Sequence, residues 1–218
     1  ENPGFPDRAN FAFIGNFIHE PNWQTVLALK KIWPSIRKQL PASELHIYGA
    51  YPSQKVWELN KPKDGFIIKG RAENAIETLA QYRVLLAPIP FGAGLKGKFI
   101  DALRAGTPSI TTTIGAEGFS NNELWNGYIT DVEKDFVANA VQLASHESDW
   151  QQASEKGEQL LKALNSEALF SEFMSTIEKL QANLDVHRRQ NIMGQILWSN
   201  QFSATKYMSL WIEAKNKG

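Results

Sequence analysis

The sequence predicts an α/β protein, in which a doubly wound, Rossmann-like parallel sheet is followed by a helical C-terminal third. Two observations predict it. Between residues 11 and 131, short apolar runs that end near glycine, proline or threonine alternate with stretches of helical spacing, as in parallel sheets with right-handed crossovers. Beyond about Asp131, only the helical spacing of apolar residues remains. The length of 218 residues suits a single domain of this class.

The expected elements follow in chain order. Strands are expected at 11–14, 44–48, 66–69, 84–88 and 108–112. Helices are expected at 22–40, with an interruption near Pro34, and at 53–59, 72–81 and 95–105. Residues 1–10 contain two prolines and a glycine and predict a linker from a missing N-terminal domain. We therefore expect a Rossmann-like domain at 11–183.

The chain end, residues 184–218, is rich in apolar and aromatic side chains. We expect this helical tail either to pack on the domain or to cross to the missing half.

Composition excludes several classes of protein. The 23 basic and 23 acidic residues balance, so no general attraction to nucleic acid is expected. No cysteine is present, which excludes disulfide frameworks and Cys-based metal sites, and the four histidines show no metal-ligand spacing. Charged residues interrupt every apolar run before it could span a bilayer, and no signal peptide is visible. We expect a cytoplasmic location and no metal.

The segment Pro90–Phe99, PFGAGLKGKF, carries the clearest chemical signal. Three glycines and two lysines lie between an expected strand and an expected helix. Glycines let the backbone approach an anion, the helix start attracts negative charge, and lysines neutralise it. The loop therefore predicts a phosphate or diphosphate site at the carboxyl edge of the sheet.

Two nucleotide-binding fingerprints nearly match this loop. Gly92, Gly94 and Gly97 satisfy G-x-G-x-x-G, with Glu117 about twenty residues on, but the dinucleotide motif follows a first strand and this loop follows the fourth. A P-loop would require Ser or Thr where Phe99 stands. An NAD(P)-binding oxidoreductase domain stays open as an alternative, and a nucleotide triphosphatase is disfavoured.

The segment FGAGLKGKFIDALRAGTPSITTTIGAEGF, residues 91–119, resembles the donor-binding signature of the retaining group-one glycosyltransferases. The resemblance extends upstream through FAFIGNFIHEPNWQTV, LHIYG and IIKG, and covers about residues 11–145. It implies the C-terminal, nucleotide-sugar-binding half of a GT-B enzyme. The donor would be a nucleoside-diphosphate sugar, such as a UDP-sugar, in carbohydrate biosynthesis, with no cofactor.

The resemblance assigns roles to residues of the loop and its helix. Asp101, where the family usually has Glu, would bind ribose hydroxyls. Lys96 and Lys98 would face the diphosphate, but two residues apart on a helix they diverge by about 200°, so we expect only one to reach it and favour Lys96. Lys98 is left open between a second substrate-binding lysine and an ordinary exposed lysine. Backbone amides from the loop would complete the diphosphate site: Gly92, Ala93, Gly94 and Leu95.

Other residues are assigned to the pocket rim. Gly115 and Glu117 of the GAEG segment would face the sugar or ribose, and Gly15 and Asn16 would lie under the donor. Arg71, after the third expected strand, is placed for a nucleobase or phosphate.

The function implied is hexosyl transfer to an unknown acceptor, together with a missing N-terminal acceptor-binding domain. The chain alone is expected to be inactive in transfer, and any peripheral membrane contact would be made through the missing half. A non-catalytic nucleotide-binding domain with a degenerate site is the remaining alternative.

Overall fold

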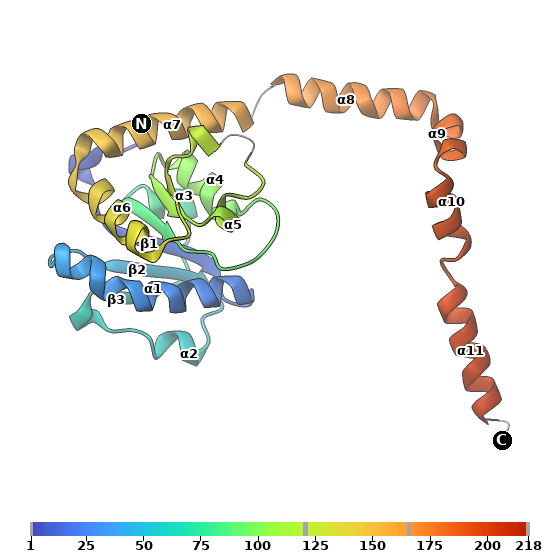
Figure 1. Cartoon of the computed structure of the whole chain (residues 1–218), viewed down its shortest axis with the longest axis horizontal. Coiled ribbons are helices and arrows are strands. Elements are labelled where there is room, and N and C mark those ends of the chain that lie inside the picture. Colours follow the sequence, from blue (N-terminus) through green and yellow to red (C-terminus); the bar gives the residue numbers. More distant parts are fainter. Residues whose placement is uncertain (1, 120–121, 165–166, 217–218) are drawn as a thin grey trace. The chain divides into compact units, whose positions relative to one another are not determined.

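The structure is a computed structural model that describes residues 2–119, 122–164 and 167–216 (Figure 1). It contains two compact units, residues 1–164 and 165–218, so the division follows Leu164, whereas the sequence placed it after residue 183. The first unit holds the sheet, and the second is helical wherever it has regular structure.

A six-stranded parallel sheet forms the centre of the first unit, with the strand order β3-β2-β1-β4-β5-β6. The strands are β1 (Ala9–Asn16), β2 (Leu45–Ala50), β3 (Phe66–Gly70), β4 (Tyr82–Ala87), β5 (Ser109–Thr111) and β6 (Gly127–Ile129). The chain winds outward from β1 to β3, then returns to β4 and winds the other way. This doubly wound order confirms the predicted fold class.

Helices cover both faces of this sheet because right-handed crossovers that run in opposite directions place their helices on opposite sides (Figure 1). One group contains α1 (Glu20–Gln39) and α6 (Glu133–Ser145), which pack against each other. The other contains α3 (Ala75–Leu79), α4 (Gly97–Arg104) and α7 (Glu147–Leu164), with α4 touching both of its neighbours. Short helices complete the unit: α2 (Gln54–Trp57), α5 (Thr113–Ala116), and the 3₁₀ turns Phe5–Asp7, Pro62–Asp64 and Asn122–Leu124.

Two expectations about the elements were wrong. Helix α1 continues through Pro34 without an interruption. Pro34 is exposed, whereas Val26, Leu29 and Trp33 lie buried on the opposite face, so packing of that face holds the helix together despite the lost backbone hydrogen bond. The sequence did not predict strand β6. It has only three residues, all half-buried, which is too short for the apolar run by which the other strands were predicted.

The N-terminal segment is joined to the first unit through Arg8, which is 1% exposed. Its guanidinium donates to the carbonyls of Pro3, Tyr82 and Ala105 at 2.7–3.3 Å and to Thr107 Oγ1 at 2.7 Å. Burial lowers the pKa of Arg8 to about 10. The buried cation thus closes one end of the sheet with hydrogen bonds to backbone carbonyls.

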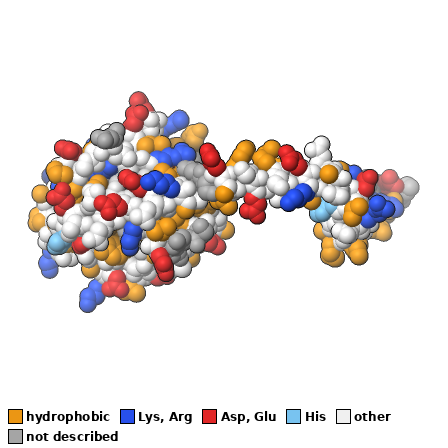
Figure 2. Space-filling model, turned by 90° about the horizontal axis from the view of Figure 1, so that it is seen from above, with side chains coloured by type: hydrophobic (Ala, Val, Ile, Leu, Met, Phe, Trp, Pro, Cys, Tyr) orange, Lys and Arg blue, Asp and Glu red, His pale blue; other side chains and the backbone are white. Residues whose placement is uncertain are grey.

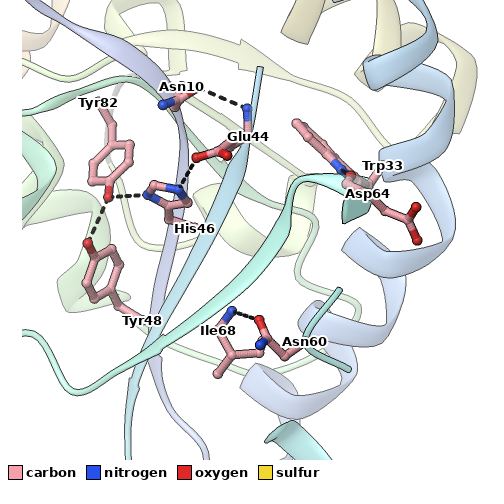
Figure 3. A network of polar contacts seen from close by, with 9 residues as sticks. All are labelled: Asn10, Trp33, Glu44, His46, Tyr48, Asn60, Asp64, Ile68 and Tyr82. Carbon is pink, nitrogen blue, oxygen red and sulfur yellow. Dashed lines mark hydrogen bonds and ion pairs between the residues drawn. The ribbon is translucent and has the colours of Figure 1, made fainter. Parts of the chain in front are cut away.

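A polar network crosses the sheet near the start of β2 (Figure 3). His46 Nδ1 lies 2.7 Å from the hydroxyl of Tyr82, which lies 2.8 Å from the hydroxyl of Tyr48. On its other side, His46 Nε2 lies 2.8 Å from Glu44 Oε2. Burial lowers the pKa of His46, although Glu44 opposes this effect. This network lies toward the amino ends of β2 and β4, and therefore away from the edge where ligands bind.

The second unit contains α8 (Glu167–Ala182), α9 (Leu184–Gln190), α10 (Ile192–Ser199) and α11 (Ser203–Asn216). Figure 2 shows hydrophobic side chains lying between charged ones on the visible face of these helices. Large exposed side chains include Phe173, Trp198, Phe202 and Trp211. None of the helices in the described ranges has the length and apolar character needed to cross a bilayer.

Candidate functional site

A cavity of about 620 Å³ opens where the strand order reverses, between the carboxyl ends of β1 and β4. Adjacent strands β1 and β4 bring the turn after β1 beside the glycine-rich loop after β4, although about 75 residues separate them in sequence. The lining residues are Ile14, Gly15, Asn16, His19, Pro21, Asn22, Ile89, Phe91, Gly92, Ala93, Leu95, Lys96, Gly97, Lys98 and Asp101. The predicted loop, turn and helix therefore meet in one cavity.

The glycine-rich loop has the backbone that its sequence suggests. Gly92 and Gly94 have φ of 127° and 73°, in the region that favours glycine. Helix α4 then begins at Gly97, with Lys96 as an extended N-cap. The first amides of α4 and its dipole are thus presented at the cavity wall, an arrangement that suits an anion.

Lys98 is the more enclosed of the two lysines at the head of α4. Its ammonium donates to Asn22 Oδ1 at 2.6 Å and lies 4.6 Å from the centroid of the buried Phe13 ring. Burial, with a smaller contribution from the neighbouring Lys96, lowers the pKa of Lys98 to about 7. An ammonium held in this way gains most from an incoming anion, because burial has removed much of its hydration.

Lys96 is held from the other side of the loop. Its ammonium donates to the carbonyl of Ile114 at 2.5 Å and lies 3.5 Å from Glu117 Oε2. The Lys96 side chain is only 12% exposed, while that of Glu117 is 56% exposed. Glu117 therefore pairs with a cation of the cavity wall.

Lys96 and Lys98 both line the cavity, and their ammoniums bind different partners, Ile114 for Lys96 and Asn22 for Lys98. That only one of the two lysines reaches a diphosphate stays a prediction. The helical angle does not apply, because Lys96 is extended, with φ −100° and ψ 108°, and only Lys98 lies within the helix. Of the two alternatives for Lys98, the ordinary exposed lysine was wrong, since its ammonium is bound to Asn22 and packed over Phe13.

Asp101 lies one turn after Lys98 on α4 and lines the same cavity. Burial raises the pKa of its carboxyl, and Arg104 partly opposes this effect. A carboxylate in this position can accept two hydroxyl hydrogen bonds, as the predicted role with ribose requires.

The other predicted residues divide into two groups. Gly15, Asn16, Gly92, Ala93 and Leu95 line the cavity. The structure does not bring the remaining four into its lining: Arg71, Gly94, Gly115 and Glu117.

Three of these four have clear positions. Arg71 follows the edge strand β3, which β2 separates from β1. Gly115 is buried against Thr111, whose Oγ1 would lie 1.8 Å from an added Cβ. Glu117 reaches the cavity wall only through its ion pair with Lys96.

Three residues that the sequence analysis did not single out shape this region. Asn22 and His19, both near the start of α1, line the cavity. Asp131 accepts hydrogen bonds from the backbone amide of Thr113 at 2.9 Å and from its hydroxyl at 2.6 Å, which hold the pKa of Asp131 below its usual value. The Pro-Asn pair after the first turn was the available signal for Asn22; no local pattern points to Asp131.

The family model for group 1 glycosyl transferases matches residues 8–146. The chain therefore belongs to this family, and its doubly wound parallel sheet has the fold of one half of GT-B glycosyltransferases. A search of the curated proteins found no match. The assignment as a glycosyltransferase domain agrees with the resemblance seen in the sequence and gives no support to an oxidoreductase.

Solved structures with the same fold include TarM, of which one structure from S. aureus contains UDP. The first TarM structure has a TM-score of 0.65 and 15% identity, over 80% of this chain and 37% of that one. The pneumococcal O-GlcNAc transferase GtfA, solved with UDP and GlcNAc, has a TM-score of 0.58 and 20% identity, over 81% and 37%. A trehalose 6-phosphate synthase from Burkholderia multivorans has a TM-score of 0.61 and 11% identity, over 83% and 45%. The chain thus spans less than half the length of these proteins.

Proposed function

We propose that this chain binds the donor of a glycosyltransferase, a nucleoside-diphosphate sugar, and that the complete enzyme transfers the hexosyl group to an acceptor with retention of configuration. The observation that carries the proposal is the cavity at the strand reversal, which is lined by the head of α4 and by the two lysines Lys96 and Lys98. The family membership and the UDP in the TarM and GtfA structures support this choice of ligand.

The arrangement suits the charge that develops in the reaction. As the bond between the anomeric carbon and the diphosphate breaks, negative charge grows on the leaving diphosphate. Lys96, Lys98, the loop amides of Gly92 and Ala93, and the helix dipole would stabilise that charge, with no metal required. Asp101 would hold the ribose, so that the anomeric carbon is placed toward the open side of the cavity.

The acceptor half is proposed to lie outside this chain. Support comes from the fact that the structures it resembles are more than twice as long as their matched part. We expect the 218-residue chain to bind donor but to transfer sugar poorly. Normal turnover in a transfer assay on this chain would contradict that expectation.

The test is a thermal-shift and calorimetric screen without magnesium against UDP, GDP, several UDP- and GDP-sugars, and NAD. A ligand that binds only the native state raises the melting temperature. We expect one of the nucleoside diphosphates and its sugars to raise the melting temperature without magnesium. We expect NAD to leave the melting temperature unchanged. The change Lys96→Ala should weaken diphosphate binding by about 1 to 3 kcal/mol. Binding of NAD alone, or of none of these ligands, would refute the proposal.

A further inference from the structure

The ammonium of Lys98 touches one polar side chain among the contacts that the structure describes, the amide of Asn22. That amide spans two parts of the site. Its oxygen accepts from Lys98 Nζ at 2.6 Å, and its nitrogen donates to the backbone carbonyl of Asn16 at 2.8 Å. Asn22 therefore ties the head of α4 to the carboxyl end of β1.

The chemistry of the two partners fixes the orientation of this amide. An ammonium can only donate hydrogen bonds and a backbone carbonyl can only accept them, so the amide oxygen must face Lys98 and the amide nitrogen must face Asn16. Neither Asp nor Leu can satisfy both partners at once. The tight fit at Gly15, where an added Cβ would lie 2.8 Å from the Asn22 amide, leaves the side chain little room to turn.

We infer that Asn22 is a positioning residue, which aims the Lys98 ammonium into the cavity toward the donor diphosphate and leaves its positive charge unneutralised. This inference rests on the proposed function, and it adds a residue that acts on the ligand through another side chain.

An amide suits this task better than a carboxylate. A carboxylate at position 22 would form an ion pair with Lys98, and a diphosphate would then have to displace it against charge repulsion. Among the described residues that line the cavity, the other titratable groups are Lys96, Asp101 and His19. Of these, the positive charge of Lys96 lowers the pKa of Lys98. A negative charge bound beside the Lys98 ammonium would oppose this effect, so binding of an anion there is favourable.

The test compares wild type with Asn22→Asp and Asn22→Ala in the full chain. The first readout needs no nucleotide: the titration of Lys98 is followed by NMR on protein with ¹³C-labelled lysine, with the signal assigned from its absence in Lys98→Gln. We expect Asn22→Asp to raise the pKa of Lys98 and Asn22→Ala to lower it. The matched control is Asn74→Asp, which adds the same charge at the exposed N-cap of α3 and should leave the titration unchanged.

The second readout is the affinity for UDP and GDP at pH 6.5, measured by calorimetry. We expect both Asn22 variants to bind the nucleotide that wild type prefers about tenfold more weakly, while Asn74→Asp binds it normally. A purely structural role of Asn22 would lower the melting temperature without moving the Lys98 titration in opposite directions.

The outcomes separate the two proposals. An identical Lys98 titration in wild type and both Asn22 variants overturns the inference, even if wild type binds nucleotide well. A titration that responds, with unchanged nucleotide affinity, also overturns it. A wild type that binds neither UDP nor GDP overturns the proposed function, and this inference with it.

Discussion

The pKa of Lys98 makes diphosphate binding depend on pH in a defined direction. Burial lowers this pKa to about 7, so the ammonium is fully present only below pH 7. A bound diphosphate favours the charged form and raises the pKa in the complex. Affinity is therefore greatest below pH 7 and falls as pH rises from there toward the pKa of the complex.

The size of this effect follows from the hydrogen bond that the ammonium gains. A charged hydrogen bond of about 1.5 to 3 kcal/mol corresponds to a change of about one to two pKa units on binding. The affinity for UDP should then fall about ten- to hundredfold between pH 7 and pH 9. The terminal phosphate of UDP does not add to this slope, because its second pKa is near 6.

The assay is isothermal titration calorimetry with UDP between pH 6.5 and 9, in pairs of buffers with different ionisation enthalpies. We expect uptake of about 0.4 to 0.8 proton at pH 8, for a shift of about one to two pKa units. The control is Lys98→Arg, whose guanidinium stays charged throughout this range, so its affinity should be nearly independent of pH. A flat wild-type profile, or the same slope in Lys98→Arg, would refute the reasoning.

Three further predictions concern the frame of the site. Gly15→Ala places a Cβ 2.8 Å from the Asn22 amide and should weaken UDP binding about tenfold, as measured by the same calorimetry. Normal affinity for UDP would contradict this prediction and would show that the backbone at Gly15 can shift to make room. Arg8→Ala leaves buried carbonyls without a donor and should lower the free energy of unfolding by about 3 kcal/mol in urea titrations. An unchanged free energy of unfolding would mean that water replaces the guanidinium and would contradict this prediction. Because the pKa of His46 is lowered in the folded protein, stability should decline as pH falls below about 6.5, and His46→Gln should flatten that profile; an unchanged profile would contradict this assignment.

The class of fold and the chemical character of the loop were predictable because both are local properties. Apolar periodicity marks each strand and helix, and the glycines and lysines of residues 92–98 mark an anion site, whatever lies beside them. The roles of Lys96 and Lys98 were less predictable. A helical angle assumes that both residues lie in the helix, but the N-cap geometry of Lys96 depends on its bonds to Ile114 and Glu117, further along the chain.

Only the tertiary structure decided the strand order, and with it the cavity. Placing β1 beside β4 depends on how helices on both faces of the sheet pack, and this is a sum of many weak, non-local contacts that no short segment encodes. That neighbourhood brings Asn22 to Lys98 across 76 residues, and it separates Arg71 from the cavity by a whole strand. The sequence by itself determined which loop carries the glycines and lysines from which an anion site is predicted, whereas the packing of the sheet determined which other side chains line the same cavity.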